Sequence, residues 1–309
     1  MPQTIKAVVC AIDFSPFSAP VVDHGVALAR RTDVPLYLIH AVHDPQDGAH
    51  ADTVFERGGD LAHMKHDAKQ KIGELMADTG VAWEAAVRFG DPVEQTVDFV
   101  KGLPPSLVVS ASHGVSGFRR LFIGTVVERL TRALHQPMLV VKPTDQTNPG
   151  RFDGFSSAVV SCDRRGCWQR SAPLMPMLQV RSGSTIHLVH AMEGPLDHAM
   201  EDADAASYSQ SQQAHSDRLH RRLYAQAKPL LGHAQTLTVA VAPGEPQEMV
   251  LQAAREQRAD VIVVGVRRSG KVGRWISGST TEALLRRAPC SVLTVPEPMD
   301  QGTHRGGIR

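Results

Sequence analysis

Two glycine-bearing segments are the part of the sequence best suited to chemistry, because their backbone could hold a phosphate. The first segment, residues 109–114, reads Val-Ser-Ala-Ser-His-Gly and is followed after nine residues by Gly124-Thr125. The second, residues 264–268, reads Val-Gly-Val-Arg-Arg and is followed after nine residues by Gly278-Ser279. Glycine lets a phosphate approach the backbone closely, and a helix that begins after the loop would present its first N–H groups and the positive end of its dipole. The pattern favours two phosphate-binding loops.

These segments belong to an internal duplication that spans most of the chain. A repeat of this length indicates two similar structural units. At an offset of 150 positions, Asp13 matches Asp163 and His40 matches His190. At an offset of 154 positions, Gly90 matches Gly244 and Gly124 matches Gly278. The four-residue difference in length between the copies therefore falls between His40 and Gly90.

Length and composition fit two domains. A chain of 309 residues with 42% hydrophobic content is long enough for two cores, since a typical domain has about 100–150 residues. The polar stretch 144–150 ends in Asn-Pro-Gly, which is typical of a linker. We expect one domain over residues 1–146, a second over 154–298, and a disordered tail over 299–309.

Charge and cysteine content argue against several classes of protein. The formal net charge of +1 gives no reason to expect binding to nucleic acid or to an anionic membrane surface. No apolar run reaches the roughly 18 residues of a membrane span, and no signal-peptide pattern opens the chain. The 4 cysteines include no Cys-x-x-Cys pair, which argues against a disulfide framework or a thiolate metal site. We expect a soluble, cytoplasmic protein.

Hydrophobic periodicity predicts alternating strands and helices in each copy. In the first copy, strands are expected at residues 5–12, 36–42, 81–88, 106–110 and 138–141, and helices at residues 16–31, 60–78, 92–101 and 125–135. In the second copy, strands are expected at residues 158–161, 185–190, 237–241, 261–264 and 291–295. This alternation predicts an α/β fold of two repeated, doubly wound, five-stranded parallel-sheet domains. Pro173 and Pro176 should kink or break the first helix of the second copy.

The expected elements bring several of these residues to one crevice. In an open parallel sheet, ligands bind outside the carboxyl ends of the strands. Asp13 ends the first strand, Ala41 lies near the end of the second, and residues 111–114 leave the fourth.

The helix starts have another interpretation, which is purely structural. Thr125 and Glu128, like Ser279 and Glu282, are spaced as capping boxes, which would satisfy the first N–H groups of each helix internally. Asp13 could likewise cap the helix that follows it, as could Asp163 in the second copy.

The aspartate, the glycine-bearing loop and the length of the repeat together resemble the universal stress protein family, specifically its tandem two-domain members. The resemblance covers nearly the whole chain and implies a fold like that of the adenine-nucleotide alpha hydrolases. It also implies a regulatory role in stress responses and binding of ATP or another adenine nucleotide, with or without Mg²⁺. By this resemblance, Asp13 contacts the ribose, the backbone at Ala41 contacts the adenine, and the phosphates are contacted by Gly114, Gly124, Thr125 and Val126.

Both copies depart from the family motif of Gly-x-x-Gly, nine residues and Gly-Ser/Thr. The first copy has Ala111 in the first glycine position, where a methyl group is an obstruction only if φ is positive. The second copy has Arg268 in the second glycine position, where the side chain either adds a phosphate contact or fills the pocket. We therefore expect the first copy to bind ATP more tightly. The implied positions of the second site are Asp163, Ala191, Gly265, Arg268, Gly278, Ser279 and Thr280.

Catalytic and metal-dependent chemistry has weaker support. Residues 265–271 fit Gly-x-x-x-x-Gly-Lys, but Val272 follows where a magnesium-binding hydroxyl is required. His63 and His66 lie at helical spacing without a third ligand placed by the sequence, and His113 is most simply a solvent-facing loop residue. No nucleophile and base stand at a motif spacing. We predict no catalytic residue, no metal site in the protein, and at most slow ATP hydrolysis.

Two other functions stay open at this point. One is a two-domain adaptor with vestigial nucleotide sites, which would act through its surfaces. The other is an enzyme on the same scaffold, such as an ATP pyrophosphatase or a nucleotidyl transferase. No Ser-Gly-Gly-x-Asp-Ser loop or His-x-Gly-His motif supports the enzyme.

The fifth strands of the two copies, residues 138–141 and 291–295, carry no charge and no internal proline. Uncharged apolar strand edges are templates for pairing, and the family resemblance implies association through the same strands. We expect these strands to pair with one another, or with a second chain in a homodimer.

Overall fold

Strands and helices alternate along the first copy in the predicted order. The computed structural model describes residues 5–42, 61–77, 79–112, 124–142, 152–163, 167–178, 183–192, 205–230, 236–266 and 279–297. The first copy contains β1 (Ala7–Ala11), α1 (Ser18–Thr32), β2 (Leu36–Val42), α2 (Leu61–Leu75), β3 (Trp83–Phe89), α3 (Pro92–Lys101), β4 (Ser106–Ala111), α4 (Thr125–Ala133) and β5 (Met138–Val141). The predicted tail, residues 299–309, and the predicted linker, residues 144–150, lie outside the described residues.

The second copy repeats this order with one interrupted helix. It contains β6 (Ser157–Ser161), α5 (Cys167–Ser171), η1 (Ala172–Leu174), α6 (Met175–Leu178), β7 (Thr185–Met192), α7 (Ala205–Ala227), η3 (Lys228–Leu230), β8 (Thr236–Pro243), α8 (Pro246–Glu256), β9 (Val261–Val266), α9 (Ser279–Arg287) and β10 (Ser291–Pro296). The 3₁₀ helix η1 contains Pro173, and α6 contains Pro176. Proline removes a helical hydrogen bond and clashes with the preceding turn. The predicted break is therefore confirmed.

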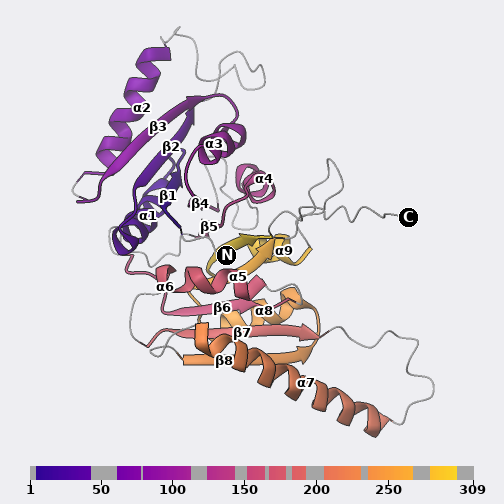
Figure 1. Cartoon of the computed structure of the whole chain (residues 1–309). Coiled ribbons are helices and arrows are strands. Elements are labelled where there is room, and N and C mark those ends of the chain that lie inside the picture. Colours follow the sequence, from indigo (N-terminus) through magenta and orange to yellow (C-terminus); the bar gives the residue numbers. More distant parts are fainter. Residues whose placement is uncertain are drawn as a thin grey trace, which may run out of the picture.

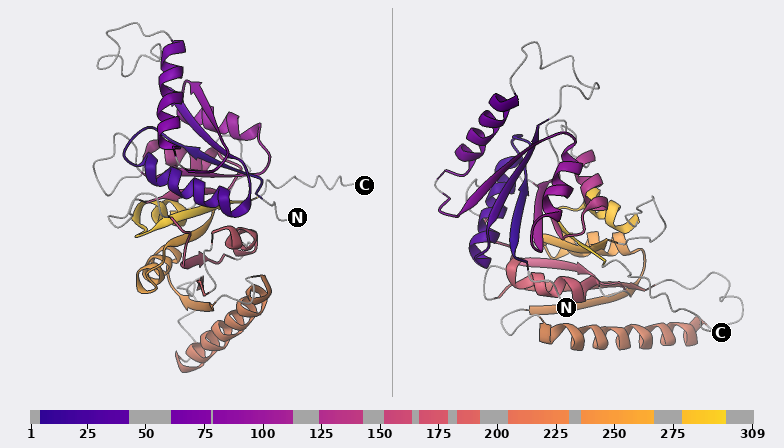
Figure 2. Two further views of the ribbon diagram at one scale, coloured as in Figure 1. Left: turned by 90° about the vertical axis from the view of Figure 1, so that its left-hand side faces the viewer. Right: turned by 45° about the horizontal axis from the view of Figure 1, so that its top comes forward.

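All the described strands form one sheet, in the order β3-β2-β1-β4-β5-β10-β9-β6-β7-β8 (Figure 1). Strands pair in parallel within each copy, whereas β5 and β10 pair antiparallel and join the copies. Two further views show the copies lying one beyond the other along this single sheet (Figure 2). The predicted fold class is confirmed, and so is the pairing of the two fifth strands with one another.

The junction between the copies has a local twofold symmetry. Leu139 of β5 pairs with Leu293 of β10, and these residues occupy the same position in the two copies, 154 residues apart. The helices α4 and α9 repeat the relationship through an ion-pair network. Its members are Arg132 with Glu128, Arg286 with Glu282, Arg132 with Glu282 and Arg286 with Glu128. The two copies therefore associate within one chain as identical subunits associate in a symmetric dimer.

Helices cover both faces of the sheet, and each face has its own apolar core. On one face, α1, α2, α5 and α6 contribute buried side chains to a core that spans both copies. On the other face, α3, α4, α8 and α9 do the same. The central strands are consequently buried on both sides, which explains why β1 and β4 read as near-continuous apolar runs.

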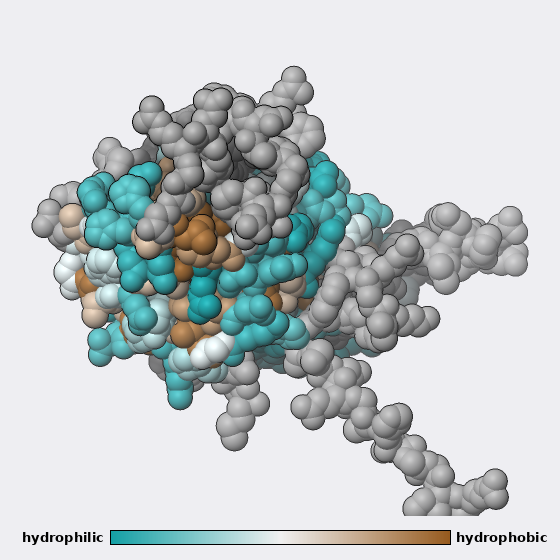
Figure 3. Space-filling view, turned by 90° about the horizontal axis from the view of Figure 1, so that it is seen from above, coloured by the Kyte–Doolittle hydropathy of each residue, from teal (hydrophilic) through white to brown (hydrophobic). Residues whose placement is uncertain are grey.

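The surface carries few exposed apolar residues. Viewed from above, the described part of the first copy is largely hydrophilic with a small apolar area near its centre (Figure 3). Among the described residues, the large hydrophobic side chains that are exposed are Leu61, Trp83 and Tyr224, which lie on separate elements. No helix in this part of the chain is long and apolar enough to cross a membrane.

Candidate functional site

The strand register brings the predicted residues of the first copy to one edge of the sheet. Ala11 of β1 pairs with Ile39 of β2 on one side and with Ser110 of β4 on the other. Because all three strands run in the same direction, the residues that leave their carboxyl ends lie next to one another. Ala41 and Ala111 are both partly exposed there, and Asp13 is exposed two residues past the end of β1.

Asp13 organises the turn between β1 and α1. Its Oδ1 accepts hydrogen bonds from the Ser15 N–H at 3.0 Å and from the Ser18 hydroxyl at 3.2 Å. Phe14, between Asp13 and Ser15, has a positive φ of 58°, a conformation that few residues other than glycine adopt. The N-cap of α1 is Phe17, without a side-chain cap. Asp13 therefore holds the turn in shape and does not cap the helix.

A histidine holds the ends of the first two strands together in each copy. His40 Nδ1 lies 3.0 Å from the carbonyl oxygen of Ile12, and His190 Nδ1 lies 2.8 Å from that of Cys162. A carbonyl oxygen only accepts, so Nδ1 carries the hydrogen in both rings. Burial lowers the pKa of His40, although the hydrogen bond to Ile12 raises it. Neutral histidine is thus the form that holds this edge near neutral pH.

An open pocket of about 370 Å³ adjoins the Asp13 turn, lined by Phe14, Ser15 and Ser18 and by Lys71 of α2. The Phe14 ring lies 4.3 Å from the His40 ring, centroid to centroid. The Lys71 ammonium lies 5.6 Å from the centroid of the Phe14 ring, within the range of a cation–π interaction. The candidate site therefore extends from the end of β1 toward α2.

The residues that flank the glycine-bearing segment of the first copy are hydrogen-bonded to one another. The Gly124 N–H donates to the carbonyl oxygen of Ser112 at 3.0 Å. Ser112, which is fully buried, donates its own N–H to the carbonyl oxygen of Val141 at 2.9 Å. The chain therefore leaves β4 and re-enters the fold at the same point. Residues 113–123 lie outside the described residues, including the predicted site residue Gly114 and the loop histidine His113.

The start of α4 differs from the capping-box interpretation. Gly124 is the N-cap residue, with φ −59° and ψ 137°, and no described side chain caps the helix. The Glu128 carboxylate instead pairs with Arg132 and Arg286. The interpretation fails because Thr125 is already the first helical residue, so a capping side chain would have to stand at Gly124, which has none. The first N–H groups of α4, at Thr125 and Val126, point out of the helix end.

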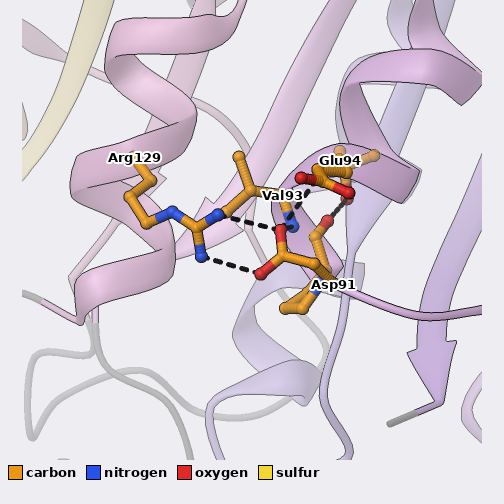
Figure 4. Close-up of polar contacts among 6 residues, drawn as sticks. Asp91, Val93, Glu94 and Arg129 are labelled. Carbon is orange, nitrogen blue, oxygen red and sulfur yellow. Dashed lines mark hydrogen bonds and ion pairs between the residues drawn. The ribbon is translucent and has the colours of Figure 1, made fainter. Parts of the chain in front are cut away.

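An arginine on α4 fixes this helix to α3. Arg129 donates two hydrogen bonds to the Asp91 carboxylate, at 2.7 and 3.0 Å, while Asp91 Oδ1 also accepts from the N–H groups of Val93 and Glu94 (Figure 4). Burial raises the pKa of Asp91, but the hydrogen bonds from Arg129 and the two N–H groups outweigh it, and the pKa lies below its usual value. Asp91 thus caps α3 and anchors α4 at once.

The second copy repeats part of this arrangement. Asp163 is partly exposed after β6, and Ala191 lies near the end of β7. Gly265 accepts a hydrogen bond at its carbonyl oxygen from the Thr281 hydroxyl at 2.9 Å, which ties β9 to α9. Ser279 and Thr280 begin α9. Two predicted residues of this site, Arg268 and Gly278, lie outside the described residues. So does the part of the Gly-x-x-x-x-Gly-Lys match from residue 267 to Lys271.

Three of these features were missed from the sequence. The histidine–carbonyl pairs could have been suspected, because His40 and His190 align in the repeat. The hydrogen bond from Gly124 to Ser112 joins residues 12 positions apart, and the bond between Arg129 and Asp91 joins residues 38 positions apart. No spacing rule indicates either contact. For metals, the described residues contain no group of three or more His, Cys, Asp or Glu side chains suited to hold an ion.

The sequence model of the universal stress protein family matches residues 4–142 and again residues 176–296. The chain belongs to the universal stress protein family. Two separate matches account for the internal duplication, so this is a tandem member. The second match begins at Pro176, inside α6.

Single-domain relatives match about one copy each. A universal stress protein of Methanocaldococcus jannaschii is 28% identical over 139 residues, which cover 44% of this chain and 82% of that protein. A universal stress protein of Thermus aquaticus is 30% identical over 143 residues, which cover 46% of this chain and 98% of that protein.

Solved structures match the whole tandem arrangement. A universal stress protein of Archaeoglobus fulgidus has a TM-score of 0.61 and 19% identity, covering 95% of this chain and 99% of that one. A functionally unknown protein of Pseudomonas aeruginosa has a TM-score of 0.66 and 15% identity, covering 95% and 93%. The chain therefore has the Rossmann-like fold of the adenine-nucleotide alpha hydrolases, in two joined copies.

Proposed function

We propose that this tandem universal stress protein binds ATP or a related adenine nucleotide at the first copy, with or without Mg²⁺, and that occupancy regulates a stress response. Asp13 contacts the ribose, and the backbone at Ala41 contacts the adenine. The N–H groups of Thr125 and Val126 hold the phosphates. Gly124 donates its own N–H to Ser112, so its part is to fix the start of α4 while placing neither a capping group nor a negative charge beside these N–H groups.

The observation that carries this proposal is the hydrogen bond from Gly124 to Ser112 at a helix end that no described side chain caps. The hydrogen bond from Gly124 to Ser112 sets the start of α4 at the carboxyl end of β4. The first N–H groups of a helix have no partner within it, and its dipole places partial positive charge there. With no described side chain at the cap, a phosphate is a suitable partner for these groups.

The first copy is the better candidate of the two. Arg129 anchors α4 to the Asp91 cap, whereas the matching residues of the second copy are Ala283 and Glu245. Glu245 makes no side-chain cap bond to α8. The helix α9 is instead joined to α8 by Arg287 and Glu248 and to β9 by Thr281. The difference that favours the first copy is therefore in the motif, where the sequence of the second copy has Arg268 in a glycine position.

Binding without rapid turnover fits the residues present at this edge. Fast phosphoryl transfer requires a positioned water or nucleophile and charge stabilisation as the transition state develops. Asp13 Oδ1 accepts from Ser15 and Ser18, and His40 Nδ1 donates to Ile12, so these polar groups are already engaged in holding the edge together. An adaptor with vestigial sites is the remaining alternative, and it requires that no nucleotide binds.

Isothermal titration calorimetry with ATP tests the proposal on the whole chain. The variant Gly124→Asp should lose more than about tenfold in affinity, because aspartate is a favoured N-cap residue that occupies the N–H groups and repels phosphate. The φ of −59° at Gly124 accommodates a side chain, so the Gly124→Asp variant should fold. Gly124→Ala is the matched control, since it adds a methyl group without a cap or a charge. An unchanged affinity in Gly124→Asp would contradict the proposed site.

A further inference from the structure

A second hollow, of about 680 Å³, runs along α9 at the junction of the two copies. Ser279 and Ala288, from the start of α9 and the residue after its end, both line it, so it spans the length of the helix. Arg255 of α8 borders it, and Lys142, which follows β5 of the first copy, also lines it. None of the candidate nucleotide residues of the first copy lines this hollow, whereas Ser279, a candidate of the second copy, lies at one end of it.

The lining is strongly cationic. It holds four cationic side chains, Lys142, Arg255, Arg286 and Arg287, against one carboxylate, Glu282. Glu282 pairs with Arg286, and Arg287 pairs with Glu248 on α8. These two carboxylates balance the charges of Arg286 and Arg287. The positive charges of Lys142 and Arg255 therefore exceed the negative charge of the lining.

Lys142 is held so that its charge borders the hollow. Its Nζ donates to the carbonyl oxygens of Ala288 at 2.5 Å and Arg286 at 3.3 Å, and its backbone N–H donates to the Ser291 hydroxyl at 3.2 Å. An ammonium has three N–H bonds, and these two carbonyls use two of them. Burial lowers the pKa of Lys142, so an anion nearby would offset the cost of keeping its charge there.

The hollow breaks the twofold symmetry of the junction. The position of Ala283 on α9 corresponds to Arg129 on α4, whose guanidinium is bound to Asp91. The position of Lys142 corresponds to Pro296, the last residue of β10. The equivalent surface of α4 therefore has a large side chain where α9 has a methyl group, and a proline where the hollow has a lysine. The cationic lining of the hollow along α9 therefore has no full counterpart along α4.

We propose that this hollow is a second ligand site, which binds a small molecule through a multiply charged phosphate group. Guanidinium groups match phosphate oxygens with paired hydrogen bonds, and a lysine adds a point charge. Small-molecule sites have volumes of about 300–1,000 Å³, and this hollow lies within that range. The site is independent of the nucleotide proposed at the first copy.

Titration of the full-length chain with inorganic pyrophosphate tests the proposal by calorimetry. Lys142→Met keeps the apolar stem and removes the charge, and Arg255→Gln changes an exposed residue that the fold does not depend on. Each variant should weaken binding at least tenfold. Lys101→Gln is the matched control, because Lys101 occupies the position of Arg255 in the first copy, and it should leave the affinity within twofold of the unchanged chain.

Titration of the Gly124→Asp variant with pyrophosphate distinguishes this site from the proposed nucleotide site of the first copy. Gly124→Asp should leave the pyrophosphate binding that depends on Lys142 intact, so the site can be present whether or not ATP binds at the first copy. If Lys142→Met does not fold, Arg255→Gln decides the matter. No binding by the unchanged chain at millimolar pyrophosphate would overturn the proposal. So would binding that survives the Lys142 and Arg255 changes, or that Lys101→Gln weakens equally.

Discussion

The backbone N–H of Gly124 donates to the carbonyl oxygen of Ser112 across 3.0 Å, although the two residues are 12 positions apart. This bond fixes the first turn of α4 above the end of β4. It also means that the sheet sets the position of this helix end, through Ser112 and Val141, and no side chain in the described part of the chain caps it. A ligand at this point would meet N–H groups already held in place.

Acid should destabilise the chain through His24, which lies on α1 and stacks on Phe152 at 3.7 Å between ring centroids. Burial lowers the pKa of His24 to about 4, against an ordinary value of 6.5. Between these values the unfolded chain binds a proton that the folded chain does not, so stability falls as the pH drops from 6.5 toward 4. At pH 5 the loss should be about 2 kcal/mol.

Urea denaturation at pH 5 and pH 7 measures this loss. His24→Leu should show a smaller difference between the two pH values, because it cannot take up the proton. His40 and His187 also have lowered pKa values from burial, so a part of the pH dependence should stay. An equal difference in the variant and the unchanged chain would rule out His24 as the source.

Gly25 should not tolerate a methyl group. It lies in the middle of α1, where alanine would ordinarily stabilise a helix by about 1 kcal/mol. A Cβ at this position would lie 2.1 Å from the Cys10 sulfur and 3.3 Å from Leu36 Cδ1. Because overpacking costs about 1–3 kcal/mol, Gly25→Ala should lower the free energy of unfolding. Thermal denaturation checks this, and adding Cys10→Ala should restore much of the loss by removing the sulfur.

The Asp91 cap should contribute more than its counterpart in the second copy. Asp91→Ala removes the bonds to Val93 and Glu94 and leaves Arg129 without its carboxylate, so we expect a loss of about 1–2 kcal/mol. Glu245→Ala is the matched control, because Glu245 makes no side-chain cap bond, and it should cost less than about 0.5 kcal/mol. Equal losses in chemical denaturation would show that the cap is not the cause.

The sequence predicted the strands well because parallel strands buried on both faces read as short apolar runs, as in Val8 to Cys10 and Leu107 to Val109. It also predicted the joining of the copies, since the β5 and β10 edges are uncharged. It did not predict how α4 begins. The capping pattern at Thr125 and Glu128 is local, whereas the actual start depends on Ser112 and on charges from α9. Contacts between distant residues, such as Asp91 with Arg129, have no local signature.

Steady-state release of phosphate at saturating ATP and Mg²⁺ should be slow. Enzymes typically turn over about 1–10³ times per second, and we expect a rate well below this range because no described group at the site is placed to activate water. A rate within the enzymatic range that is lost in Gly124→Asp would move the protein to the enzyme class.

Native mass spectrometry of the intact chain, titrated with ATP, tests the central claim most directly. We predict a species that carries one ATP at low micromolar concentrations, before any second nucleotide binds, and that Gly124→Asp removes while Gly124→Ala retains it. A chain that stays free of nucleotide throughout the titration would contradict the account and favour an adaptor whose nucleotide sites no longer bind.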